Sequence, residues 1–193
     1  MVACERQLLG LALACIGLLG SIISCALPTW RIMTDNKDKI VEGLWKRSHC
    51  ESSPTGEMQC DGYKDIPLPA DIKAARGLII IAIIIEVLGI LLGVAGRNFM
   101  NFVPDERQRS KMALTSGIAF LIAGFFFLIP VSWITNNINE HIYPIQSTYG
   151  LFNVPSEKME LGAALYIGWF TTVLLFLRGG LVCSSFFRRN GTE

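Results

Sequence analysis

Long apolar segments alternate with polar loops along this chain. Four segments approach or exceed the roughly 20 apolar residues that a helix needs to cross a bilayer. They cover residues 7–27, 77–96, 112–133 and 161–187. A chain of 193 residues with four such segments has room for little else. The pattern therefore predicts a single membrane domain, residues 1–193, built on a bundle of four transmembrane helices.

The first apolar segment has one feature of a cleaved signal peptide, because Ser24, Cys25 and Ala26 are small enough for a cleavage site. Its apolar stretch is longer than the apolar core of such a peptide. We therefore expect the segment to remain in the protein as its first span.

Basic residues indicate which loops face the cytoplasm. The loop of residues 97–111 contains four Lys and Arg residues, and the tail of residues 188–193 adds two arginines. The loop of residues 134–160 contains only one basic residue. Short cytoplasmic loops carry an excess of Lys and Arg. We therefore expect a plasma-membrane protein with both termini in the cytoplasm, whose loops 28–76 and 134–160 are extracellular.

The first extracellular loop has the pattern of a small sheet. Turn-forming residues separate four short stretches with β character. These stretches are Trp30–Thr34, Lys39–Val41, Leu44–Lys46 and Met58–Gln59. Residues 69–76 then have a helical pattern and lead directly into the second span. The predicted fold class is membrane α+β, a four-helix bundle with a small extracellular antiparallel sheet.

The six cysteines divide by compartment. Cys50 and Cys60 lie in the first extracellular loop, where oxidation is permitted, and we expect a disulfide between them. Closing this loop of about ten residues is worth about 2–3 kcal/mol in the chain-entropy model. The remaining cysteines lie in the spans or at their cytoplasmic ends and are expected to be free thiols: Cys4, Cys15, Cys25 and Cys183.

Composition and motifs give no indication of catalysis. Charged residues make up 17% of the chain, against roughly 25% in a soluble domain, and the net charge is +1. Nucleic-acid binding is not expected, because no basic stripe carries interleaved aromatic residues. His49 and His141 are isolated from other metal-ligating residues. We find no nucleophile with a partner base and no phosphate loop, so we expect neither an enzyme nor a metal or cofactor site.

The spans contain small residues, one proline and two charges. Small residues recur in all four spans and let helix backbones approach closely in lipid. Pro130 should kink or close the third helix. Glu86 in the second span and Arg178 in the fourth differ by about 10 Å in depth, at a rise of 1.5 Å per residue. This offset favours a neutral or hydrogen-bonded Glu86 over a salt bridge, and both interpretations remain open.

An ordered set of aromatic, glycine and cysteine residues runs through the first extracellular loop. It consists of Trp30, the run Gly43-Leu44-Trp45, and the pair Cys50 and Cys60. Supporting segments extend along most of the chain, among them Leu68-Pro69-Ala70, Pro130-Val131-Ser132-Trp133 and residues 160–169. In this order and at these depths, the set resembles the signature of the claudin family.

The resemblance implies a left-handed bundle with an extracellular sheet, assembled side by side into tight-junction strands. It implies partners that are copies of the chain and other claudins, within one membrane and across facing cells. In claudins the sheets seal the gap between cells or line paracellular pores. The aromatic set of the second loop, with Tyr143, Pro144 and Phe152, would then contact partners.

Several residues acquire expected roles from this resemblance. We expect Trp30 and Trp45 to wedge between the sheet and the helix ends rather than to form a ligand cage. Arg76, at the outer end of the second span, is expected to act as a cap or to partner loop carbonyl groups rather than to line a pore.

Asp61 directly follows the second loop cysteine, at a position that faces the pore in claudins. A carboxylate there attracts cations, and Asp65 and Asp71 would add to its field, whereas Lys64 would oppose it. Cation selectivity, a barrier without useful conductance, and anion selectivity all remain open.

The chain also departs from the family pattern. Twelve residues separate Trp30 from Gly43, fewer than in typical claudins, which shortens the first part of the sheet. The sequence ends Asn190-Gly191-Thr192-Glu193, without the terminal Tyr-Val that docks into PDZ scaffolds, so such binding is not expected of the sequence as given. The short loop keeps a second function class open: a claudin-like auxiliary subunit that regulates an ion channel or receptor.

Overall fold

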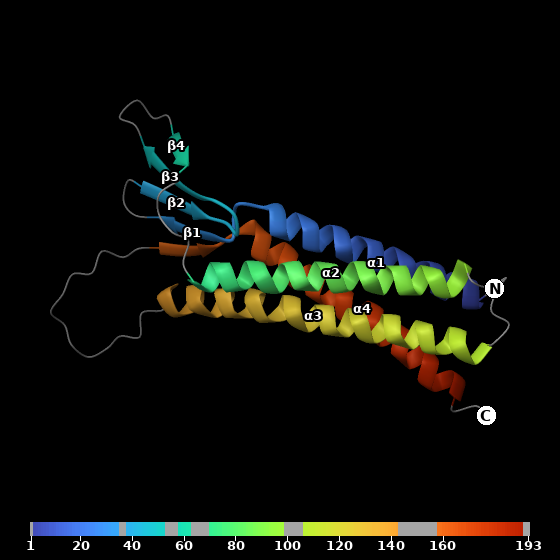
Figure 1. The fold of residues 1–193 in the computed structure, drawn as a ribbon. Coiled ribbons are helices and arrows are strands. Elements are labelled where there is room, and N and C mark those ends of the chain that lie inside the picture. Colours follow the sequence, from blue (N-terminus) through green and yellow to red (C-terminus); the bar gives the residue numbers. More distant parts are fainter. Residues whose placement is uncertain are drawn as a thin grey trace, which may run out of the picture.

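Four long helices and a five-stranded sheet make up the part of the chain that the structure, a computed structural model, describes (Figure 1). The described residues are 2–34, 38–52, 58–62, 70–98, 106–142 and 158–190. The helices are α1 (Val2–Ala26), α2 (Ala70–Asn98), α3 (Glu106–Ile142) and α4 (Ala163–Asn190). The strands are β1 (Arg31–Thr34), β2 (Asp38–Glu42), β3 (Arg47–Ser52), β4 (Met58–Gly62) and β5 (Lys158–Leu161).

The four helices lie side by side, with the sheet at one end of the bundle and both chain termini at the other (Figure 1). Each helix contains a segment long and apolar enough to cross a membrane. These segments are Leu9–Ala26, Ala70–Ala95, Lys111–Asn139 and Ala163–Phe186. The predicted fold class, four spans with a small antiparallel sheet, is therefore confirmed.

Two helices begin or end at other residues than the predicted spans. Helix α3 contains Pro130 and continues to Ile142, so the proline does not close the helix. A proline removes only one backbone donor, and transmembrane helices tolerate that loss. Helix α4 begins at Ala163 rather than at Leu161, because Leu161 is the last residue of strand β5.

The sheet has the strand order β4-β3-β2-β1-β5, and every neighbouring pair is antiparallel. Strand β3 is not among the predicted stretches, and two further segments differ from the prediction. Leu44–Lys46 forms the tight connection between β2 and β3 instead of a strand, and Gly43 N donates to Lys46 O at its base (2.9 Å). The segment Lys158–Leu161, predicted as loop and span, forms β5 and pairs with β1, so both loops contribute to one sheet.

Glycines lie at the contacts between helices, as the small-residue pattern predicts. An added Cβ at Gly17 of α1 would lie 3.1 Å from Leu175 of α4, and one at Gly89 of α2 would lie 3.0 Å from Phe120 of α3. The pattern does not hold everywhere, because Gly77 and Gly180 have no neighbour within 4 Å. Close approach therefore explains most, but not all, of the small residues in the spans.

Candidate functional site

The junction between the sheet and the bundle begins with the two tryptophans of the first loop. The last four carbonyl groups of an α-helix have no partner within the helix. In α1, Leu27 N donates to Ile23 O (3.0 Å) and Trp30 Nε1 donates to Ser24 O (2.9 Å). Trp45 Nε1 donates to Cys25 O (2.9 Å). The two indoles therefore cap the first helix from the sheet side.

The exposure of the two tryptophans differs. Trp30 is fully buried, as expected of a wedge between the sheet and the helix ends, whereas Trp45 is 49% exposed. The guanidinium of Arg76 lies over the ring of Trp45, 5.1 Å from its centroid. Arg76, which was expected to act as a cap or to bind loop carbonyls, thus contacts the capping indole of Trp45 through a cation–π interaction.

The Gly-Leu-Trp run brings Trp45 to the helix end. A Cβ at Gly43 would lie 2.6 Å from Pro28 Cα, so only glycine lets the connection pack against the chain that leaves α1. Leu44 is fully buried beside it. Trp30 N donates to Glu42 O (2.9 Å), which holds the start of β1 against the end of β2. This run is therefore a structural element of the junction.

The start of α4 is fixed to the same point. Gly162 N donates to Trp30 O (3.2 Å) and Ala164 N donates to Thr29 O (3.1 Å). Ser24 Oγ of α1 donates to Ala164 O (3.0 Å). A side chain at Gly162 would overlap the backbone of Thr29, which accounts for the glycine there. The first span, the sheet and the fourth span consequently meet within a few residues.

Four charged side chains form a second connection, between the sheet and α2. Arg31 Nη2 of β1 lies 2.9 Å from Asp71 Oδ2 in the first turn of α2. Arg31 Nη1 lies 3.5 Å from Glu42 Oε2 of β2, and Arg47 Nε of β3 lies 3.8 Å from Glu42 Oε1. Glu42 is fully buried and Arg31 is 8% exposed. Burial has removed much of the hydration of these charges. Their pairing therefore depends on the fold keeping the side chains close together.

Burial raises the pKa of the Glu42 carboxyl, and the nearby Asp71 carboxylate acts in the same direction. The positive charges of Arg31 and Arg47 partly offset this effect. Asp71 was expected to add to the field of a pore. Its short contact with Arg31 instead makes it part of this junction.

Cys50 of β3 is disulfide-bonded, and the strand register places Cys60 of β4 directly opposite it. This arrangement supports the expected Cys50–Cys60 bond. Cys15, Cys25 and Cys183 are free thiols, as expected, and Cys4 lies among the residues whose side chains are not described.

Only part of the expected pore and contact surface falls within the described residues. Asp61 lies in the edge strand β4 opposite His49, and its side chain is not described. Asp65, Tyr143, Pro144 and Phe152 lie outside the described residues.

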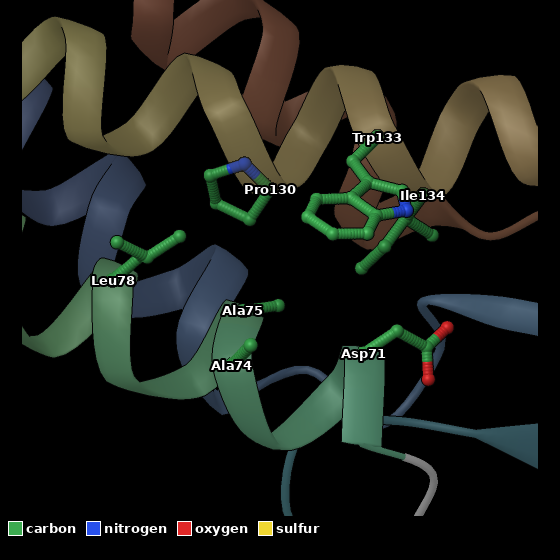
Figure 2. A pocket seen from close by; sticks show the side chains of 7 residues that line it. All are labelled: Asp71, Ala74, Ala75, Leu78, Pro130, Trp133 and Ile134. Carbon is green, nitrogen blue, oxygen red and sulfur yellow. The ribbon is translucent and has the colours of Figure 1, made fainter.

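A small pocket lies beside the junction, between α2 and α3 (Figure 2). Ala74, Ala75 and Leu78 line it from α2, and Pro130, Trp133 and Ile134 line it from α3. Its one ionisable residue, Asp71, lies at one end with its carboxylate directed away from Pro130 and Leu78 (Figure 2). Because that carboxylate is paired with Arg31, the pocket has the character of an apolar notch rather than a catalytic centre.

The two intramembrane charges do not form an ion pair within the described residues. Ser21 Oγ of α1 donates to Glu86 Oε1 (2.7 Å). Arg178 of α4 lies over the ring of Phe120, 5.5 Å from its centroid. The hydrogen-bonded interpretation of Glu86 is thus the one that the contacts favour.

Sequence reasoning did not single out Arg31 and Glu42 as a charged pair. A signal was available, because each lies next to a signature residue, Arg31 after Trp30 and Glu42 before Gly43. The pairing itself requires the antiparallel register of β1 with β2, which places Arg31 directly opposite Glu42.

These features define a class of protein: a multi-pass membrane protein whose four spans carry a disulfide-bonded antiparallel sheet at one end. The model of the PMP-22/EMP/MP20/Claudin family matches residues 5–182. Similar curated proteins include Claudin-4 of Bos taurus, 42% identical over 95% of this chain and 87% of that protein. Claudin-3 of Homo sapiens is 38% identical over 93% of this chain and 81% of that protein. The chain belongs to the PMP-22/EMP/MP20/Claudin family.

The indole cap gives a first testable prediction. Trp30→Phe keeps the aromatic bulk but leaves Ser24 O without its donor, which should destabilise the fold by about 1–3 kcal/mol. The readout is the thermal unfolding of the purified protein in detergent. Trp169→Phe is the matched control, because that indole is 39% exposed and its bond to Thr135 Oγ1 is longer, at 3.3 Å. Equal, small shifts for both variants would contradict a capping role.

The buried carboxyl of Glu42 gives a pH prediction. The pKa of Glu42 in the folded protein is raised above its ordinary value of 4.5. At pH values between 4.5 and the raised pKa, the folded protein therefore keeps a proton on this carboxyl that the unfolded chain has lost. The free energy of unfolding should therefore increase as the pH falls through that window. Glu42→Gln cannot titrate, so its stability curve should lack this component. Parallel curves for the two proteins would mean that Glu42 does not titrate differently on folding.

Proposed function

We propose that this chain is a tight-junction protein that adheres to copies of itself and to other claudins. In this role it seals the space between cells or forms an ion path through it. The observation that carries the proposal is the sheet fixed to the spans at one end of the bundle, in a chain of this family. The named relatives are claudins, and membership of the family agrees with the expectation that the chain is not an enzyme.

The proposed orientation places the sheet outside the cell and both termini in the cytoplasm. Cys50 is disulfide-bonded, and disulfides persist in oxidising compartments such as the cell exterior. The excess of basic residues in the loop 97–111 supports the same orientation. In Figure 1 both termini lie at the end of the bundle opposite the sheet, so the proposed orientation puts both on the same side of the membrane.

Within this function we propose that Asp61 biases the path toward cations. Support comes from its place in β4, an edge strand of the sheet, where a side chain can border the space beside the protein. A carboxylate at the border of a narrow aqueous path attracts cations and repels anions. Asp71 is already paired with Arg31, so the selectivity is assigned to Asp61, with Asp65 as a second contributor.

Expression in cells that lack tight-junction strands tests the overall proposal. Freeze-fracture electron microscopy should reveal continuous strands where two expressing cells meet. The chain should also change the transepithelial resistance of claudin-deficient monolayers. Surface delivery without strands, together with co-purification of an ion channel, would favour an auxiliary subunit instead.

Asp61→Asn tests the assignment of selectivity. In a watery path one unit charge shifts the energies of a sodium and a chloride ion at about 8 Å by about 0.5 kcal/mol each, in opposite directions. Removing it changes their energy difference by about 1 kcal/mol, so the sodium-to-chloride permeability ratio should fall about fivefold. Dilution potentials of the monolayers measure this ratio. Glu160→Gln is the matched control, because Glu160 is an exposed carboxylate in β5, at the opposite edge of the sheet. An unchanged ratio in Asp61→Asn monolayers that conduct would overturn the assignment.

A further inference from the structure

Glu86 of α2 is buried in the bundle with one hydrogen-bond partner. The side chain is 0% exposed. Ser21 Oγ of α1 donates to Oε1 (2.7 Å), whereas Oε2 is buried and has no hydrogen-bond partner among the described residues. An ionised carboxylate would have exchanged its hydration for a single hydrogen bond. Such an exchange is strongly unfavourable unless a cation lies nearby.

Arg178 of α4 does not supply that cation. Its guanidinium lies against Gly10 of α1 and Gly93 of α2, and above the ring of Phe120 in α3. Gly93 lies two helical turns from Glu86 along α2, a separation of about 10 Å. Across the described part of the chain, no salt bridge includes either Glu86 or Arg178. The two residues therefore occupy different depths of the bundle.

We propose that Glu86 is an uncharged carboxylic acid in the folded protein and forms a polar link between α1 and α2. Its carbonyl oxygen accepts the hydrogen of Ser21, and its own O–H is offered from the second oxygen. The protonated form needs no counter-charge, which agrees with the absence of a nearby cation among the described residues. A neutral group also removes the cost of burying a charge while keeping the hydrogen bond that fixes α1 against α2.

A second buried hydroxyl lies against the neighbouring residue of α1. Thr171 of α4 is 0% exposed, and its Oγ1 has no hydrogen-bond partner among the described residues. It lies against Gly20, the residue that precedes Ser21 on α1. Two unpartnered polar atoms thus border the same turn of α1.

Infrared spectroscopy tests the protonation state directly. The full chain is reconstituted in lipid at neutral pH, and the spectrum of Glu86→Gln is subtracted from that of the wild type. The difference should contain the carbonyl band of a protonated carboxylic acid. Ser21→Ala should shift this band to higher frequency, because it removes the hydrogen bond to the carbonyl oxygen. A difference spectrum with carboxylate bands and no acid band would overturn the proposal.

Thermal unfolding separates the uncharged acid from an ion pair. Glu86→Gln preserves shape and neutrality and should melt close to the wild type, whereas Glu86→Leu should melt several degrees lower because Ser21 loses its acceptor. The effects of Glu86→Gln and Arg178→Gln should add in the double variant, as expected of side chains that are not in contact. A strongly destabilised Glu86→Gln that Arg178→Gln rescues would show that the two residues are an ion pair. That result would overturn the proposal without affecting the proposed function.

Discussion

The capping of α1 by two indole N–H groups is the interaction on which the rest of the junction depends. A transmembrane helix ends with carbonyl groups that must find donors as the chain leaves the bilayer. Here Trp30 and Trp45 supply the donors for Ser24 O and Cys25 O. Both come from the sheet, so satisfying the helix end and docking the sheet are the same event. A sheet detached from the bundle would leave these carbonyls without their donors.

Ion pairs and backbone hydrogen bonds connect the sheet to two further helices. The caps connect the sheet to α1, whereas the pair of Arg31 with Asp71 connects it to the first turn of α2. The hydrogen bonds of Gly162 and Ala164 connect it to α4. With three helices holding its base, the sheet has a fixed orientation relative to the bundle. Such rigidity matters for a selectivity residue, because a charge acts on passing ions only if its position in the path is constant.

Much of the fold was predictable from the sequence, because membrane constraints leave few alternatives. Apolar length determines the number of spans, and the Gly-Leu-Trp run with paired cysteines identifies the sheet-bearing loop. Strand β5 was not predictable, since Lys158–Leu161 is short and becomes a strand only by pairing with β1. The path of α3 through Pro130 to Ile142 was not predictable either, because local propensity cannot tell how far a proline-containing helix continues.

The candidate site divides in the same way. The aromatic, glycine and cysteine residues have recognisable spacing, and the structure places Trp30, Gly43 and Trp45 at one junction. Asp71 belongs to the junction because it contacts Arg31, which lies 40 positions away in the sequence. Glu42 belongs to it because the sheet places it opposite Arg31. Sequence spacing carries no information about such contacts. The ion network and the hydrogen bond from Ser21 to Glu86 therefore required the packed helices, whereas the separate depths of Glu86 and Arg178 followed from the sequence.

The short connection between Trp30 and Gly43 does not weaken the anchor, because the register keeps the shortening away from the base. Arg31 pairs with Glu42 at the base, and Thr34 pairs with Lys39 at the far end of the hairpin. The described hydrogen bonds and ion pairs that fix the sheet to the bundle involve residues at this base, such as Trp30, Arg31 and Gly162. Each residue removed from a strand shortens its reach by about 3.3 Å. The shortening therefore changes how far the hairpin extends from the bundle, while the attachment of the sheet to the spans is unchanged.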